Sequence, residues 1–290
     1  MQPPPQADAT PREDGALASE LERHGRWFVL TGAGCSTESG IPAYRDARGA
    51  WQHKPPIQLR DFLANDAVRQ RYWARSFVGY GRVRGAEPNA AHLALARFQR
   101  LGLLHTLVTQ NVDGLHQKAG SEHVIDLHGQ LAAVQCLSCS STLERDALQA
   151  HLLARNPSLA QLASKAAAPD GDMHIDDEIC RTLAVPSCRS CGGILKPAVV
   201  FFGEAVPAQR IADAYRALAE SDALLVVGSS LMVFSGYRFV RRAAEAGKPI
   251  VVINRGVTRA DPFAKLKIEG ACGALLHAAV TSLEGTLDRR

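Results

Sequence analysis

The chain lacks an apolar run long enough to cross a membrane, and it lacks a basic cluster of the kind that binds nucleic acid. Its net charge is only +4, from 33 Lys and Arg against 29 Asp and Glu that are interspersed along the sequence. No internal repeat is visible. We therefore expect neither a membrane partner nor a nucleic-acid partner. The mild positive charge suits an anionic cofactor or an acidic partner without predicting either, and the oligomeric state stays open.

The N-terminus lacks the features of a targeting segment. It has no apolar core of a secretory signal, and acidic side chains such as Asp8, Glu13 and Asp14 argue against a mitochondrial transit peptide. Residues 1–20 are rich in Pro, Ala and acids, which favours a disordered tail. We expect a cytoplasmic protein, in which the odd number of cysteines, seven, indicates metal binding in preference to a disulfide framework.

Short runs of Val, Ile and Leu recur along the rest of the chain, with helix-like stretches between them. Strands buried on both faces are apolar throughout, so these runs indicate a parallel sheet covered by helices. The expected strands are 27–30, 105–109, 123–127, 198–202, 223–227, 249–253 and 266–268. The expected helices are 90–101, 207–221, 235–246 and 273–287. This order predicts an α/β protein with an open parallel sheet of the Rossmann type.

Two segments interrupt this alternation. Residues 48–99 include an aromatic- and Arg-rich stretch without clear strands, and residues 132–193 hold paired cysteines. We interpret the first as a cofactor-loop and helical insertion and the second as a zinc-binding insertion, and we expect the two to pack together as a smaller lobe. The Rossmann-type domain then consists of 21–47, 100–131 and 194–290.

Four of the cysteines form two Cys-x-x-Cys pairs, Cys136 with Cys139 and Cys188 with Cys191. Two such pairs supply the four sulfur ligands of a tetrahedral Zn²⁺ site. With cysteine at every position there is no weak ligand to give way to a reactive water, so we expect a structural site. Two metal-free pairs or a redox pair are the alternatives. Cys35 and Cys180 are expected to be small packing residues.

Polar residues follow several of the expected strands. Gly32, Ala33 and Gly34 come after the first strand, where a glycine-rich turn can bring backbone N–H groups up to a pyrophosphate. Other strands are followed by Gln110, Asn111, Asp113, His128, Gly228, Ser229 and Asn254. Because the carboxyl ends of parallel strands meet at one edge of a sheet, these turns predict a dinucleotide site. His128 is a candidate general base, whereas Asp113 could equally cap the next helix.

These segments together resemble the sirtuins, which are NAD-dependent protein-lysine deacylases. The matching segments are 32–46, 109–116, 126–129, the two cysteine pairs, 196–204, 226–231 and 252–254, in the order of the family. The long stretch between the cysteine pairs, with 54–58 and 235–238, is similar to the class II branch. That branch is associated with ADP-ribosyl transfer and with removal of lipoyl and branched acyl groups.

The resemblance implies NAD and Zn²⁺ as cofactors and acylated-lysine proteins or peptides as substrates. It implies NAD contacts from Gly32, Ala33, Gly34, Tyr44, Arg45, Asp46, Gln110, Asn111, Asp113, Gly228, Ser229, Asn254 and Cys272. His128 would act as the general base on a ribose hydroxyl, with Asn111 and Asp113 as further catalytic candidates. The acyl oxygen would attack the ribose C1′, and the products would be nicotinamide, O-acyl-ADP-ribose and free lysine.

The resemblance also places the substrate. The peptide would enter between an expected strand at Val200–Glu204 and the loop Leu231–Ser235, and Val200 and Phe201 would contact it. Tyr72 and Arg75 form a Tyr-x-x-Arg that is similar to the pair with which other sirtuins bind acidic acyl groups. Three other functions stay open: mono-ADP-ribosyl transfer to protein, a Rossmann dehydrogenase and a zinc-ribbon binding module.

Overall fold

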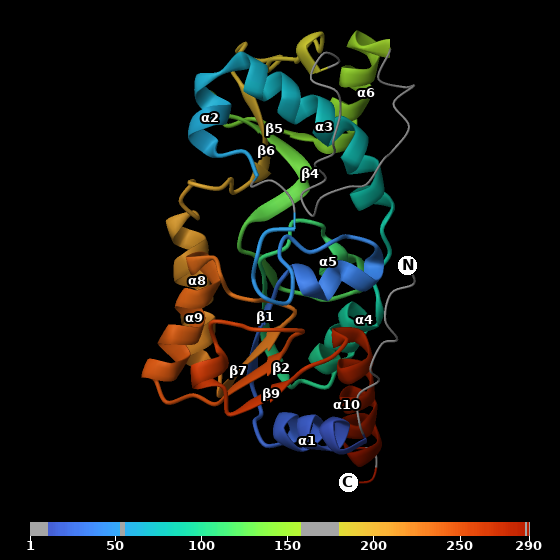
Figure 1. Cartoon of the computed structure of the whole chain (residues 1–290), viewed down its shortest axis with the longest axis vertical. Coiled ribbons are helices and arrows are strands. Elements are labelled where there is room, and N and C mark those ends of the chain that lie inside the picture. Colours follow the sequence, from blue (N-terminus) through green and yellow to red (C-terminus); the bar gives the residue numbers. More distant parts are fainter. Residues whose placement is uncertain (1–10, 53–55, 158–179, 288, 290) are drawn as a thin grey trace.

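The computed structural model describes residues 11–52, 56–157, 180–287 and 289 (Figure 1). A large lobe contains a six-stranded sheet, and a smaller lobe, at the top of Figure 1, contains a three-stranded sheet with α2, α3 and α6 around it. Within these residues no helix has the length and apolar character needed to cross a membrane. Residues 1–10 of the expected tail, 54–55 of the class II segment and 158–179 of the expected zinc-binding insertion lie outside the described residues.

The large sheet is parallel throughout and has the order β3-β2-β1-β7-β8-β9. Its strands are β1 (Trp27–Thr31), β2 (Leu104–Thr109), β3 (Val124–Asp126), β7 (Ala223–Val227), β8 (Ile250–Ile253) and β9 (Leu266–Ile268). Every residue of β1, β7 and β8 is buried, which explains their continuous apolar sequences. The strand order reverses between β1 and β7, and in open α/β sheets ligands bind outside the carboxyl ends of strands at such a point.

Helices cover both faces of this sheet, as Figure 1 shows. Trp27 and Val29 of β1 face a core shared with α1 (Pro11–Glu22), α4 (Ala90–Arg100) and α10 (Cys272–Leu287). Phe28 and Leu30 face the opposite core, shared with α8 (Ala208–Glu220) and α9 (Phe234–Glu245). The twofold alternation of a strand thus distributes its side chains between two helical layers. These observations confirm the predicted Rossmann-type sheet.

The smaller lobe is built around an antiparallel sheet of order β5-β4-β6. Its elements are α2 (Leu59–Ala64), α3 (Asp66–Gly85), β4 (Gly129–Cys136), β5 (Thr142–Glu144), α6 (Arg145–Arg155) and β6 (Leu195–Val199). The core joins Phe62 and Trp73 of the first insertion to Leu148 and Leu152 of the second. The two insertions therefore share one hydrophobic core. Short turns of helix occur at η1 (Ala33–Ser39), α5 (Leu115–Lys118) and η3 (Asp261–Phe263).

The expectation of a disordered tail over 1–20 is wrong from Pro11 onward, where α1 begins. Leu17, Ala18 and Leu21 lie on one face of this helix and are buried against α10, and Lys265 donates a 2.6 Å hydrogen bond to Glu20. A polar, Pro-rich composition concealed an apolar stripe at helical spacing.

Three expected boundaries also differ from the structure. The expected insertion 48–99 includes α4, which packs on the large sheet through Leu95 and Phe98. The expected parallel strand 198–202 is instead β6, shifted toward the N-terminus and paired antiparallel with β4 in the small sheet. β4 and β5 were not expected, because β4 alternates between buried and partly exposed residues and β5 has only three residues.

Candidate functional site

A cleft of about 770 Å³ lies at the carboxyl ends of β1 and β7 and extends to the smaller lobe. The predicted residues that line it are Gly32, Ala33, Gly34, Tyr44, Arg45, Asp46, Tyr72, Gln110, Asn111, Asp113, His128, Val200, Phe201, Gly228, Ser229, Asn254 and Cys272. Of the predicted site residues outside the cysteine pairs, Arg75 is not part of the lining. Strand ends far apart in the sequence therefore converge on one cleft, as expected for a dinucleotide site.

The glycines after β1 and β7 interlock. Gly34 donates a 2.8 Å backbone hydrogen bond to the carbonyl of Gly228. Gly228 has a φ of +60°, and a Cβ there would lie 2.3 Å from the backbone nitrogen of Cys35. A Cβ on Gly32 would lie 2.7 Å from that of Ser229. Only glycine allows this approach, which leaves bare backbone at the cleft where the pyrophosphate of NAD would fit.

Ser36, Asn111 and Asp113 form a hydrogen-bonded chain beside this turn. Asn111 Nδ2 donates to the Gly32 carbonyl at 3.1 Å and to Ser36 Oγ at 3.0 Å. Ser36 Oγ in turn donates to Asp113 Oδ2 at 2.7 Å. The other carboxylate oxygen of Asp113 accepts from the Leu115 backbone N–H at 3.0 Å, at the start of α5. The bond to Leu115 agrees with the helix-capping interpretation of Asp113, and its contact with the cofactor stays a prediction.

His128 is held through both ring nitrogens. Nδ1 lies 2.8 Å from the backbone carbonyl of Gln110, and Nε2 lies 2.8 Å from Ser235 Oγ. A carbonyl can only accept, so Nδ1 must carry the proton and Nε2 of the neutral ring has a free electron pair. Burial lowers the pKa of His128, the bond to Gln110 partly opposes this, and the Arg210 charge lowers it further. The imidazole is therefore a neutral base near pH 7, with its basic nitrogen at Nε2.

Gln110 connects this histidine to the turn after β7. Its side-chain Nε2 donates to Ser229 Oγ at 2.9 Å and to the carbonyl of Thr31 at 3.2 Å. A Cβ on Gly236 would lie 2.4 Å from Gln110 Oε1, so a larger residue there would displace the amide group. The amide side chain is thus fixed among three elements, and its backbone carbonyl is fixed with it.

Segment 44–51 folds over one side of the cleft. The rings of Tyr44, Trp51 and Phe202 pack edge to face, with centroids 5.6–6.2 Å apart. Arg45 lies over the Trp51 ring at 3.9 Å and donates to the Gly49 carbonyl at 2.7 Å. Asp46 accepts backbone N–H bonds from residues 48 and 50, both at 2.9 Å. Arg45 and Asp46 shape this turn, which can exclude water from the cleft.

Two further lining residues follow β8 and β9: Asn254 Nδ2 donates to the Arg255 carbonyl at 2.9 Å, and Cys272 begins α10. Burial raises the pKa of the Cys272 thiol to about 12, and it raises that of Cys35 well above its usual range. Neither thiol is therefore an activated nucleophile near pH 7. Cys35 and Cys180 are buried in cores, as predicted.

Behind the cleft wall lie the buried side chains of Cys35, His92 and His116, close enough together to be considered as metal ligands. The two imidazole rings pack at a tilt with their centroids 4.7 Å apart, and burial lowers both pKa values, that of His92 to about 4. His92 Nε2 lies 3.4 Å from Ser36 Oγ, and His116 Nε2 lies 2.9 Å from Thr31 Oγ1. These histidines support the polar residues of the cleft from behind.

The smaller lobe supplies an apolar wall. Phe201 packs on Phe62 and Tyr72, with ring centroids 5.1 and 5.2 Å away. The expected strand at Val200–Glu204 is instead a loop, since β6 ends at Val199. Its shape comes from Glu204, whose carboxylate accepts from the Phe201 backbone N–H at 2.7 Å and from Lys196 Nζ at 3.0 Å.

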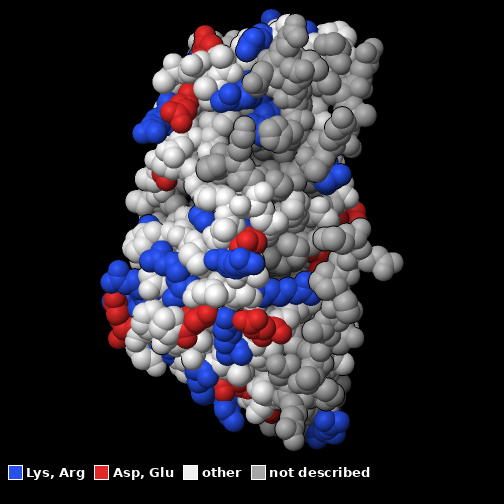
Figure 2. Space-filling view, viewed as in Figure 1, with Lys and Arg blue, Asp and Glu red and all other residues white. Residues whose placement is uncertain are grey.

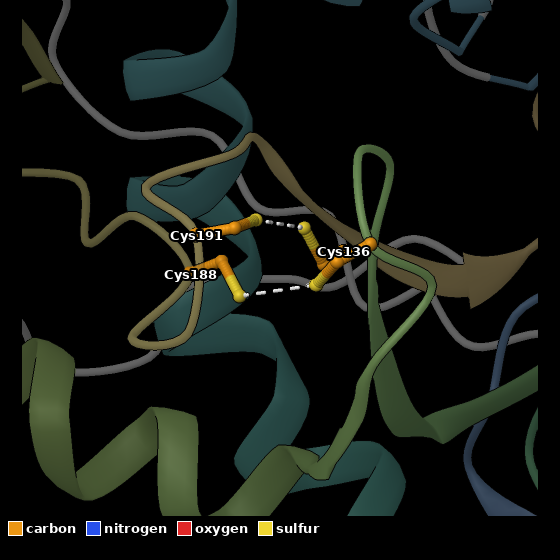
Figure 3. A group of neighbouring side chains, drawn as sticks. Cys136, Cys188 and Cys191 are labelled. Atoms are coloured by element: carbon orange, nitrogen blue, oxygen red, sulfur yellow. Dashed lines mark hydrogen bonds between the residues drawn. The ribbon is translucent and has the colours of Figure 1, made fainter.

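The four paired cysteines meet at the tips of two turns (Figure 3). Their sulfur atoms lie within 4.8 Å of one another, with Cys136 and Cys191 at 3.5 Å and Cys139 and Cys188 at 3.7 Å. A tetrahedral zinc with Zn–S bonds of about 2.3 Å needs sulfurs about 3.8 Å apart. A Cβ on Gly193 would lie 2.9 Å from Cys136 Sγ, so glycine is required there. The donor set fits Zn²⁺, and four thiolates favour a structural site.

Sequence reasoning missed two residues that shape the site. Ser36 lies inside the segment 32–46, and its position directly after a glycine-rich turn was a usable signal. Ser235 lies in the segment 235–238, which entered only through a family resemblance. No local signal pairs Ser235 with His128, because 107 positions separate them.

Comparisons with known proteins agree with this geometry. Residues 32–235 match the family model described as Sir2 family. The chain is 52% identical over 274 residues to an NAD-dependent protein deacetylase of Xanthomonas axonopodis pv. citri (strain 306), covering 93% of each chain. It is 46% identical over 276 residues to the NAD-dependent protein lipoamidase sirtuin-4, mitochondrial, of Bos taurus, covering 94% of this chain and 87% of that protein.

Solved structures give the same result. A complex of a Sir2 homolog with NAD has a TM-score of 0.72 and 29% identity, and covers 94% of both chains. A Sir2–p53 peptide–NAD⁺ complex has a TM-score of 0.71 and 28% identity, and covers 96% of this chain and 100% of that one. Because the family model matches residues 32–235 and the relatives align over most of the chain, the chain belongs to the Sir2 family.

Proposed function

We propose that the protein removes acyl groups from lysine side chains of proteins in an NAD-dependent reaction that yields nicotinamide and O-acyl-ADP-ribose. The observation that carries this proposal is the neutral, oriented imidazole of His128 in a cleft lined by glycine turns. The names of the relatives support it, since one is called a protein deacetylase and another a protein lipoamidase. Acylated proteins or peptides are then the substrates.

In this proposal the residues of the cleft position groups, exclude water and move one proton. Bound NAD supplies an electrophilic ribose carbon and nicotinamide as the leaving group. His128 Nε2 accepts the proton of a ribose hydroxyl, and the Gln110 carbonyl stabilises the imidazolium through Nδ1. The chain of Ser36, Asn111 and Asp113 would hold the nicotinamide end of the cofactor. The aromatic turn at 44–51 would cover it.

The acyl chain would lie against the apolar wall. Val199, Phe201 and Val233 line the cleft on the side where the smaller lobe meets the loop after β7. An apolar wall favours uncharged acyl chains, because burying a carboxylate without a partner is costly. Binding of acidic acyl groups by Tyr72 and Arg75 stays a prediction, and of these two only Tyr72 lines the cleft.

The test uses NAD labelled in its adenylate and a panel of acyl-lysine peptides. Deacylation predicts nicotinamide release that depends on the acyl peptide, with the label recovered in a small O-acyl-ADP-ribose. Label bound to protein, without loss of the acyl group, would instead establish mono-ADP-ribosyl transfer. Reduction of the nicotinamide ring, visible in the absorbance spectrum, would establish a dehydrogenase. A cytoplasmic location stays a prediction.

A further inference from the structure

A second groove, of about 780 Å³, runs along α8 and α9 beside the cleft. Its lining includes the cationic side chains of Arg238, Arg241, Arg242 and Lys248 and one acid, Glu245. Figure 2 shows basic side chains gathered over the part of the surface where Figure 1 places these helices, with acidic ones near them. The groove has a positive balance, which suits an anionic ligand.

The groove is continuous with the cleft. Phe234 and Arg238 line both; Phe234 lies within the loop Leu231–Ser235, and Arg238 comes three residues after it. Phe234 is 50% exposed, so its ring can pack against a bound chain. A chain that leaves the cleft along Leu231–Ser235 therefore meets Phe234 and Arg238 first.

Arg238 differs from the other cations of the groove in its partners. Its guanidinium stacks 5.1 Å from the Phe234 ring, and among the described residues it has no acidic partner within ion-pair distance. Its Nε atom is buried and has no hydrogen-bond partner in the described part of the chain. Because no acid of the described residues pairs with this guanidinium, its charge is available to an anionic group of a ligand.

The remaining cations already have contacts. Arg241 and Arg242 lie 3.6 and 3.8 Å from Glu245, but all three side chains are more than half exposed. Such surface pairs are weak and rearrange at little cost. Lys248 donates to the backbone carbonyls of Ala219 and Ser221. Among the described residues, Arg238 is thus the cation of the groove with neither an acidic partner nor a backbone carbonyl partner.

We propose that this groove, with Arg238 at its centre, recognises acidic side chains that flank the acylated lysine of the substrate protein. The proposal rests on the deacylase function and adds to it a preference in substrate sequence. A guanidinium donates two parallel hydrogen bonds to a carboxylate, and the exposed ring of Phe234 packs on the methylenes of a Glu or Asp side chain. The same site would disfavour substrates with Lys or Arg at these positions.

The test compares two acyl-lysine peptides that differ only in Glu or Gln at the positions near the lysine. At low salt we expect the enzyme to favour the acidic peptide about five- to tenfold in kcat/KM, mainly through KM, and the preference to shrink as salt is added. Arg238→Gln should bring the ratio between the two peptides close to one. Arg238→Glu should reverse the charge preference, so that a peptide with Lys at these positions is a better substrate than the peptide with Glu.

Arg216→Gln is the matched control, because Arg216 lies on α8, pairs with Asp213 and is outside the groove lining. It should keep the wild-type ratio. Direct binding of fluorescent peptides, measured without turnover, separates this proposal from the deacylase function. Selective binding of the acidic peptide without nicotinamide release would reject only the reaction, whereas equal binding of both peptides by the wild type would reject the acidic preference.

Discussion

His128 Nε2 and Ser235 Oγ lie 2.8 Å apart, so the basic nitrogen of the cleft faces a hydroxyl of the same chain. Ser235 is 9% exposed and stands in the first turn of α9, and His128 follows β3. A hydroxyl can donate to the neutral ring and, after rotation, accept from the protonated ring. Hydrogen bonds to a charged group are about twice as strong as those between neutral groups. Ser235 therefore favours the imidazolium over the imidazole.

Ser235→Ala should weaken His128 as a base. Loss of the acceptor lowers the pKa of His128 below its value in the wild type, so the acidic limb of the kcat/KM profile should move to lower pH. At the plateau kcat/KM should fall about fivefold, which corresponds to ~1 kcal/mol of lost hydrogen bonding to the imidazolium. NMR titration of the imidazole measures the same shift without turnover. An acidic limb that stays in place or moves upward would contradict this role, and Ser235→Thr should restore the wild-type profile.

His128→Ala removes the base itself. Deacylation should fall about 10²–10⁴-fold, the usual contribution of one general base. Thermal stability and zinc content should stay close to wild type, because within the described residues the imidazole bonds Gln110 and Ser235, and His128 is not part of the cysteine tetrad. His105→Ala is the control, since His105 pairs with Glu220 at 3.2 Å outside the cleft lining. Full deacylase activity of His128→Ala would remove this residue from the mechanism.

The large sheet could be predicted because β7 and β8 are apolar at every position, and β1 at all but Thr31, which is the pattern of strands buried on both faces. The short β5 and the alternating β4 carry weaker signals, and their antiparallel pairing depends on contacts that no local pattern encodes. For α1, a tail-like composition outweighed Leu17 and Leu21, which are each fully buried. For β4 and β5, and for α1, tertiary packing and not local sequence preference determines the structure.

The site divides in the same way. Gly34 and Gly228 stand in recognisable strand-end turns, so the cleft could be predicted, but their interlocking is visible only in space. The role of Ser235 depends on His128, which the fold brings to it from another element. Arg238 stands out because the described residues give it no acidic partner. Arg75 was suggested by a short motif alone; it does not line the cleft, and its role in binding an acidic acyl group stays a prediction.

Zinc removal should destabilise the smaller lobe. Cys188→Ser deletes one of four ligands, and metal binding to such a site contributes directly to folding. We expect zinc content to fall from one ion per chain toward zero and Tm to drop by more than ~5 °C. Cys180→Ala, which changes a buried cysteine outside the tetrad, should keep its zinc. Unchanged thermal stability after chelation of the wild type would contradict a structural role.

Gly228→Ala should prevent the close contact between the turns after β1 and β7. The new Cβ would lie 2.3 Å from the Cys35 backbone nitrogen, and a φ of +60° is itself strained for alanine. Because the turns must separate, we expect NAD affinity to fall at least about tenfold, or ~1.4 kcal/mol, with a smaller loss of stability. Calorimetric titration with NAD measures this. Gly81→Ala, in α3, meets no atom within 4 Å and should bind NAD as the wild type does. Equal affinity in all three proteins would show that NAD does not use this turn.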